Sequence, residues 1–140
     1  MNKHKNVIIG GIVATLAMTM LMLVAPMMGM PKMNTGEMLG GMMGGSVILG
    51  WMMHFVIGII FAYAYLYLLN KKLPVANNYL RGVIYGFIVF IFAQIIMAMM
   101  GAMGMAPEMP NENMAMMIVG SIMGHLVYGI VLGAFIKKEI

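Results

Sequence analysis

Residues 46–69 read SVILGWMMHFVIGIIFAYAYLYLL, a run without a charged side chain. An α-helix needs about 20 mainly apolar residues to cross the hydrocarbon core of a bilayer, so this stretch is long enough to span a membrane. Three other apolar segments approach the same length, at about residues 7–28, 82–101 and 115–136. The sequence therefore predicts four transmembrane helices.

The composition of the whole chain agrees with this prediction. Of its 140 residues, 63% are hydrophobic and only 9% are charged, whereas soluble domains carry about 25% charged residues. Such a chain could not cover a globular surface with polar groups. Cysteine is absent, so there is no disulfide, thiolate ligand or thiol nucleophile. We expect an all-α polytopic membrane protein that forms a single membrane domain over residues 1–140.

The basic residues gather at three places that share one side of the membrane if all four spans form. They are Lys3, Lys5, Lys71, Lys72, Arg81, Lys137 and Lys138. Only Lys32 falls on the opposite side, together with Glu37, Glu108 and Glu112. Cytoplasmic loops are enriched in Lys and Arg, so we expect both termini in the cytoplasm. The net charge of +4 is then a topology signal in contact with anionic lipid, and we expect no nucleic-acid partner.

The two halves of the sequence align without a gap when position 54 is placed on position 125. His54 then falls on His125, Glu37 on Glu108 and Gly58 on Gly129. Each half, 6–69 and 77–140, holds two spans and inserts the same way round. We predict a parallel twofold internal repeat about an axis along the membrane normal. Because the first span has a counterpart in the third, we expect it to be retained rather than cleaved as a signal peptide.

Small residues accompany both intraspan histidines at helical spacing. Gly50, His54, Gly58 and Ala62 recur every fourth residue, as do Ser121, His125, Gly129 and Gly133. Residues four apart share a helix face, and small residues on such a face let helices approach closely in lipid. We therefore expect both histidines to face the protein interior. The predicted packing positions are Gly50, Gly58, Gly82, Gly86, Gly120, Gly124, Gly129 and Gly133.

The roles of His54 and His125 stay open at this point. An ionisable residue inside a membrane span is a functional hypothesis by default, as a metal ligand, a proton relay or a substrate contact. The structural alternative is a neutral imidazole hydrogen-bonded to a neighbouring helix, for example at Thr15 or Thr19. Two imidazoles at equal depth could also hold haem b. Its cavity would be opened by Gly50, Gly58, Ser121 and Gly129.

The methionines are concentrated in two parts of the chain. Of the 23 methionines, the 22 other than Met1 lie within residues 18–53 and 97–123, which the predicted topology places toward the outer side. Thioethers are soft ligands that favour Cu(I), and Met-rich surfaces also suit adaptable contacts with partners. The candidate soft-metal ligands are Met18, Met20, Met22, Met28, Met30, Met33, Met97, Met99, Met103 and Met105.

A series of short motifs runs through the chain. It comprises Gly11-x-x-Ala14-Thr15-x-x-Met18, Pro26-Met27-Met28-Gly29, Met38-Leu39, Gly50-Trp51-x-x-His54-Phe55 with Gly58, and His125-Leu126-Val127-Tyr128-Gly129. This series resembles a family of small four-span bacterial membrane proteins described only as a domain of unknown function. The resemblance implies a four-helix fold in the bacterial inner membrane, and it supplies no activity, cofactor or catalytic residue.

The chain offers little for conventional catalysis, since it has no Asp or Cys and no Glu within a span. We interpret Glu37 and Glu108 as helix-capping residues of the outer loops. The leading prediction is a non-enzymatic accessory or scaffold protein. Its Met-rich outer face would bind a membrane-protein partner or another copy of the chain. The alternatives are Cu(I) binding or transport through the outer methionines and the two histidines, and bis-His haem binding.

Overall fold

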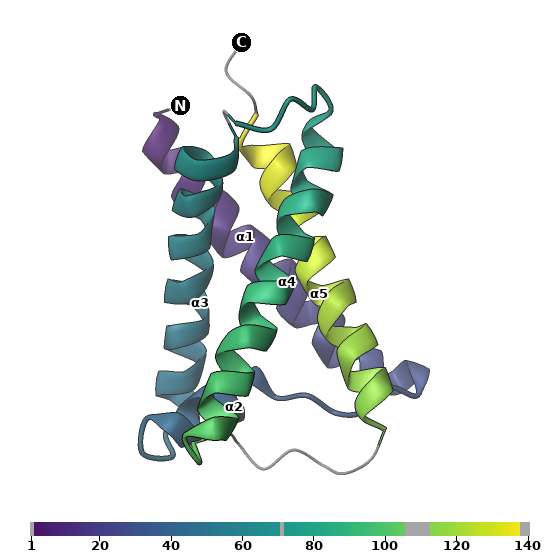
Figure 1. Cartoon of the computed structure of the whole chain (residues 1–140). Helices are drawn as coiled ribbons and strands as arrows, with labels where there is room; N and C mark the ends of the chain where they lie inside the picture. Colours follow the sequence, from purple (N-terminus) through teal and green to yellow (C-terminus); the bar gives the residue numbers. More distant parts are fainter. Residues whose placement is uncertain (1, 71, 106–112, 138–140) are drawn as a thin grey trace.

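In a computed structural model, the described residues are 2–70, 72–105 and 113–137. All elements among them are helical (Figure 1), in the following order. They are α1 (Lys3–Val24), the 3-10 turn η1 (Ala25–Met28), α2 (Thr35–Met42), α3 (Val47–Ala64), the π-helical η2 (Tyr65–Leu69), α4 (Asn78–Ala102) and α5 (Met114–Phe135). Four stretches are long and apolar enough to cross a membrane: Lys3–Met28, Val47–Leu69, Asn78–Ala102 and Met114–Phe135. The prediction of an all-α fold with four spans is confirmed.

Polar side chains fix where three of the helices begin. Asn34 Oδ1 accepts a hydrogen bond from the Glu37 amide at 3.2 Å at the start of α2. Ser46 Oγ accepts one from the Leu49 amide at 3.4 Å before α3, and Asn77 Oδ1 accepts one from the Tyr79 amide at 2.9 Å before α4. Such caps satisfy first-turn amides that have no partner within the helix. Glu37 thus lies in the first turn of α2, where its charge suits the helix dipole.

The helices form a bundle in which α1 is central. It packs against α3 and α5, while α4 packs along α5 and the short α2 packs against α3. In contrast, α3 and α4 meet mainly through side chains, including the rings of Phe61 and Phe92, whose centroids are 5.7 Å apart. Figure 1 shows the start of α1 and the end of α5 at one end of the bundle and α2 at the other. We call these the terminal end and the α2 end.

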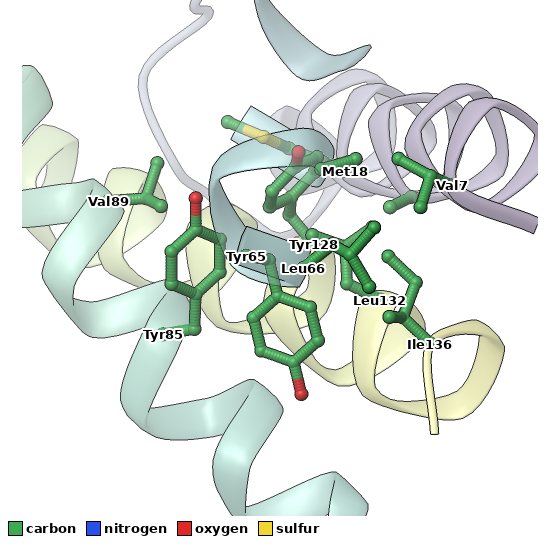
Figure 2. Packing of buried hydrophobic residues seen from close by; sticks show 11 residues of the cluster. Val7, Met18, Tyr65, Leu66, Tyr85, Val89, Tyr128, Leu132 and Ile136 are labelled. Carbon is green, nitrogen blue, oxygen red and sulfur yellow. The ribbon is translucent and has the colours of Figure 1, made fainter. Parts of the chain in front are cut away.

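The buried core lies mostly toward the terminal end. Figure 2 shows its packing, in which the rings of Tyr65 and Tyr85 lie side by side with their hydroxyls pointing in opposite directions. The core residues are Val7, Ala14, Met18, Ala62, Tyr65, Leu66, Tyr85, Val89, Tyr128, Leu132 and Ile136. Large apolar side chains elsewhere, such as Ile88, Ile91 and Ile95 on α4, are exposed. An exposed apolar face of this kind suits contact with lipid.

Two close helix contacts correspond between the halves of the chain. A Cβ built on Gly11 would lie 3.1 Å from Ile59 Cα, and one built on Gly82 would lie 3.2 Å from Ile130 Cα. Both pairs occupy equivalent positions in the alignment that places His54 on His125. The two halves thus share one kind of close glycine contact, and the twofold repeat itself stays a prediction.

The first connection at the α2 end folds onto the bundle. Its helix α2 lies so close to α3 that a Cβ on Gly50 would stand 2.9 Å from the carbonyl carbon of Gly36. The sequence predicted no helix between the first two spans. Of the second connection, residues 106–112 lie outside the described residues, and with them Glu108 and Glu112.

Candidate functional site

In the second span, His54 and the three small residues spaced around it form the buried face of α3. These residues, Gly50, His54, Gly58 and Ala62, are the buried positions of that helix. A Cβ on Gly58 would lie 3.1 Å from Thr15 Cβ of α1. The stripe therefore brings α3 against α1 and α2, and His54 lies between these contacts.

His54 is buried, and its imidazole has no polar partner among the described residues. The residue is 9% exposed, and within this part of the chain its buried Nε2 atom makes no hydrogen bond. Its ring packs edge-on against Trp51, with centroids 5.9 Å apart. The hydroxyls of Thr15 and Thr19 instead donate to carbonyls of their own helix, both at 2.8 Å. The expectation that one of these threonines would satisfy the imidazole is therefore wrong for His54.

His125 is half-buried on α5 and bonds to its own helix. Its Nδ1 atom lies 2.7 Å from the carbonyl oxygen of Ser121, to which it donates. The ring lies edge-on to Phe90 of α4, with centroids 6.0 Å apart. His54 on α3 and His125 on α5 belong to two helices that both pack against α1. Within the described part of the chain, however, no three His, Cys, Asp or Glu side chains gather into a metal site.

The space beside the histidines is filled by neighbouring helices. A Cβ on Gly129 would lie 2.8 Å from Gly86 Cα of α4, and Ser121 Oγ accepts a hydrogen bond from Gln94 Nε2 at 3.4 Å. With Gly50 and Gly58 packed as described above, none of the four positions opens a flat cavity. The geometry therefore offers no support for a haem between His54 and His125.

A cavity of about 20 Å³ lies toward the α2 end, between the end of α1, η1 with the loop after it, and α5. We call it the Met cavity. It is lined by Leu21, Met22, Ala25, Met28, Met30, Pro31, Met33, Met116, Gly120 and Met123. By this measure the space is sufficient for about one water molecule or one ion.

Glycines of α5 make room for the thioethers. A Cβ on Gly120 would lie 3.4 Å from the methyl carbon of Met33 and 3.7 Å from Sδ of Met30. One turn further along α5, Gly124 faces Met18 and Met22 of α1. The Thr35 hydroxyl lies 3.8 Å from Met22 Sδ and donates a weak hydrogen bond to it. The sulfur-bearing side chains thus come from α1 and α5 and from η1 with the loop that follows it.

The structure divides the candidate soft-metal ligands into two groups. Met22, Met28, Met30 and Met33 line the cavity, and Met18 is buried one turn from Met22. Met20 is 60% exposed. Met97, Met99, Met103 and Met105 lie on or just after the last turns of α4, and Figure 1 shows this end of α4 well apart from the start of α5. The group on α4 therefore does not contribute to the cavity.

Met116 and Met123 were not among the predicted ligands. They are seven residues apart on α5, a spacing that places both on one helix face. That face was visible in the sequence, but which helix it would meet depends on the packing of α1 against α5.

The chemistry of the Met cavity is that of neutral, soft donors. Thioether sulfur suits Cu(I) and similar ions, whereas the described residues of the lining carry no carboxylate, imidazole or thiolate group. An ion of single positive charge is the species such a site can hold, because neutral ligands do little to offset a higher charge away from water.

These features describe a small helical protein of the four-span membrane class with a thioether-lined cavity at one end. Residues 1–138 match the model of the family described as "Family of unknown function (DUF6789)", and the chain belongs to this family. The predicted resemblance to a family of unknown function is thereby confirmed. No curated protein and no solved structure matches the chain.

Proposed function

We propose that this protein is a non-enzymatic membrane protein that binds a soft monovalent metal ion, Cu(I) or Ag(I), in the Met cavity. One observation carries the proposal: six methionines from α1, η1, the following loop and α5 line a single small cavity. The sequence alone favoured partner binding over metal binding. The convergence of these side chains reverses that order.

An empty packing defect is the main competing explanation of the cavity. Methionine is flexible and usually fills irregular gaps, yet here space remains among six of these side chains. A water molecule needs two to four polar partners in such a space, and the lining offers little besides sulfur. A soft cation can use those sulfurs as ligands, so it fits this lining better than water does.

The proposed orientation puts the Met cavity on the outer side of a bacterial inner membrane. Basic residues cluster near the chain ends and in the connection between the second and third spans, which we call the 2–3 connection. This clustering supports cytoplasmic termini, and the Met cavity lies toward the opposite end of the bundle. The ion would then enter from the periplasmic side. His54 and His125 lie further from the α2 end than the Met cavity does. If the ion is transported, they are the candidates for a second binding position along its path.

The metal site is tested by spectroscopy on protein purified without a histidine tag. After addition of Cu(I) under reducing conditions and removal of excess metal, we expect one copper per chain. X-ray absorption should show a coordination shell made of sulfur. The matched control is a Met99→Leu/Met103→Leu variant, which removes two exposed methionines outside the cavity and should bind the same amount. A shell dominated by nitrogen or oxygen, or no retained copper, would refute the proposal.

Partner binding is the second candidate function, through the methionines exposed at the α2 end. Met27 is 86% exposed and Met28 is 71% exposed, and Met42, Met43 and Met103 are also exposed. Flexible thioethers adapt to varied apolar surfaces, and the partner would be another membrane protein or a second copy of this chain. Crosslinking in membranes followed by native mass spectrometry should detect a stable complex, whereas a monomer under mild extraction would contradict this role.

A further inference from the structure

Arg81 is fully buried near the terminal end of the bundle. It lies in the first turn of α4 and is 0% exposed. Its Nη2 group donates to Asn78 Oδ1, while Nε and Nη1 are buried without a hydrogen-bond partner among the described residues. The sequence placed Arg81 among the basic residues that mark topology and touch lipid. Its complete burial is a feature that the sequence did not reveal.

Other polar groups near this end are also incompletely hydrogen-bonded among the described residues. Tyr65 of η2 is 0% exposed, and its hydroxyl lies next to the Arg81 side chain, at the margin of hydrogen-bonding geometry. Asn70, which directly follows η2, donates from Nδ2 to the Lys137 carbonyl at 3.2 Å, and its Oδ1 atom is buried without a partner. The backbone between α3 and Asn70 is π-helical, a conformation that is frequent at functional sites.

The guanidinium of Arg81 needs a counter-charge. A buried charge is strongly unfavourable unless it is paired and hydrogen-bonded. Among the described residues the one carboxylate belongs to Glu37, which lies on α2 at the opposite end of the bundle (Figure 1). An anion from outside the described chain is therefore the missing partner.

We propose that Arg81 and Tyr65 form a binding site for a phosphate group at the terminal end of the bundle. The unpaired N–H groups of the Arg81 guanidinium and the O–H of the adjacent Tyr65 phenol are donors that suit phosphate oxygens. The phosphate can be the headgroup of an anionic lipid, since basic pockets between spans bind such headgroups on the cytoplasmic side, or it can be free inorganic phosphate. This proposal does not depend on the Met cavity. The site is closed in this structure, so side chains at this end must part for the anion to enter.

The lipid source is tested by lipid retention in native mass spectrometry. The full-length protein is taken from nanodiscs containing equal amounts of phosphatidylglycerol and phosphatidylcholine. We expect preferential retention of phosphatidylglycerol, reduced about tenfold in an Arg81→Gln variant. Lys72→Gln is the matched control, because it removes the same charge from an exposed residue of the 2–3 connection near this end. It should retain the lipid as the wild type does.

The free-phosphate source is tested by thermal unfolding in detergent without anionic lipid. Inorganic phosphate should raise the Tm of the wild type and of Lys72→Gln, but not that of Arg81→Gln. The reference is a chloride buffer that contains no sulfate and has the same ionic strength. A positive result in either arm supports the site and identifies the source of the phosphate. If Arg81→Gln does not fold, Tyr65→Phe replaces it as the test variant and should bind severalfold more weakly.

Three results would overturn the proposal. One is equal binding of both ligands by Arg81→Gln and Lys72→Gln, and another is unchanged affinity in Tyr65→Phe. The third is a Glu139→Gln variant that destabilises the protein as much as Arg81→Gln, with no effect of phosphate or lipid on the wild type. Glu139 lies outside the described residues, and that result would make it the partner of Arg81.

Discussion

Gly120 leaves room for the thioethers at one wall of the Met cavity. A Cβ at this position would meet Met33 at 3.4 Å and Met30 at 3.7 Å, both through flexible side-chain ends. We expect Gly120→Ala to fold normally and to bind Cu(I) a few-fold more weakly. Gly120→Leu should fill the cavity and weaken binding more than about tenfold, or about 1.4 kcal/mol. Competition with a Cu(I) chelator measures both variants, and wild-type affinity in Gly120→Leu would show that the ion binds elsewhere.

His54 offers a second test at the residue scale. Its buried Nε2 atom has no partner, and an unsatisfied buried polar group costs about 1–3 kcal/mol. Replacing it by an apolar side chain of similar size should therefore leave stability unchanged or raise it by about 1 kcal/mol. Unfolding of His54→Leu in mixed micelles is the measurement. A loss of more than about 1 kcal/mol would indicate that the imidazole binds a group in the functional protein.

At the scale of helices, the contact between α4 and α5 depends on glycines that face backbone atoms. A Cβ on Gly82 would collide with the Gly129 carbonyl and lie 3.2 Å from Ile130 Cα. Backbone atoms cannot rotate away, so Gly82→Ala must push the helices apart, at a cost of about 1–3 kcal/mol. The control is Gly41→Ala in α2, where a Cβ would meet open space and helix propensity improves by up to about 1 kcal/mol. Equal stability of the two variants would contradict this packing.

The spans were predictable because length and hydrophobicity alone define them in a membrane protein. The buried face of α3 was also predictable, because Gly50, His54, Gly58 and Ala62 follow one another at every fourth position. In contrast, α2 was not predicted, because its eight residues are rich in Gly and Met and its stability depends on packing against α3. Arg81 is buried, and Met116 and Met30 line one cavity, because of which helices pack against one another. No local pattern in the sequence predicts that packing.

At the scale of the whole molecule, the bundle is unequal along its length. The aromatic and aliphatic core lies mostly toward the terminal end, whereas the α2 end holds the Met cavity and many exposed methionines. A densely packed end provides stability, and a loosely packed end can admit a ligand with little rearrangement. The arrangement fits a protein that takes up its ligand on one side of the membrane.

The orientation of the bundle is testable because the chain has no cysteine of its own. We expect a membrane-impermeant thiol reagent, added to intact spheroplasts, to label Glu37→Cys and not Lys72→Cys. Both residues carry exposed side chains at opposite ends of the bundle. Labelling of Lys72→Cys alone would show that the topology is the reverse of the one proposed, with the Met cavity on the cytoplasmic side.

The Cu(I) affinity of matched double variants tests the central claim most directly. Met30→Leu/Met33→Leu removes two thioethers from the Met cavity with little change in volume, and Met99→Leu/Met103→Leu removes two that lie outside it. We predict that the first variant binds Cu(I) at least about tenfold more weakly than the wild type, at unchanged Tm, and that the second binds as the wild type does. Equal affinities in the two variants would contradict a metal site in the Met cavity.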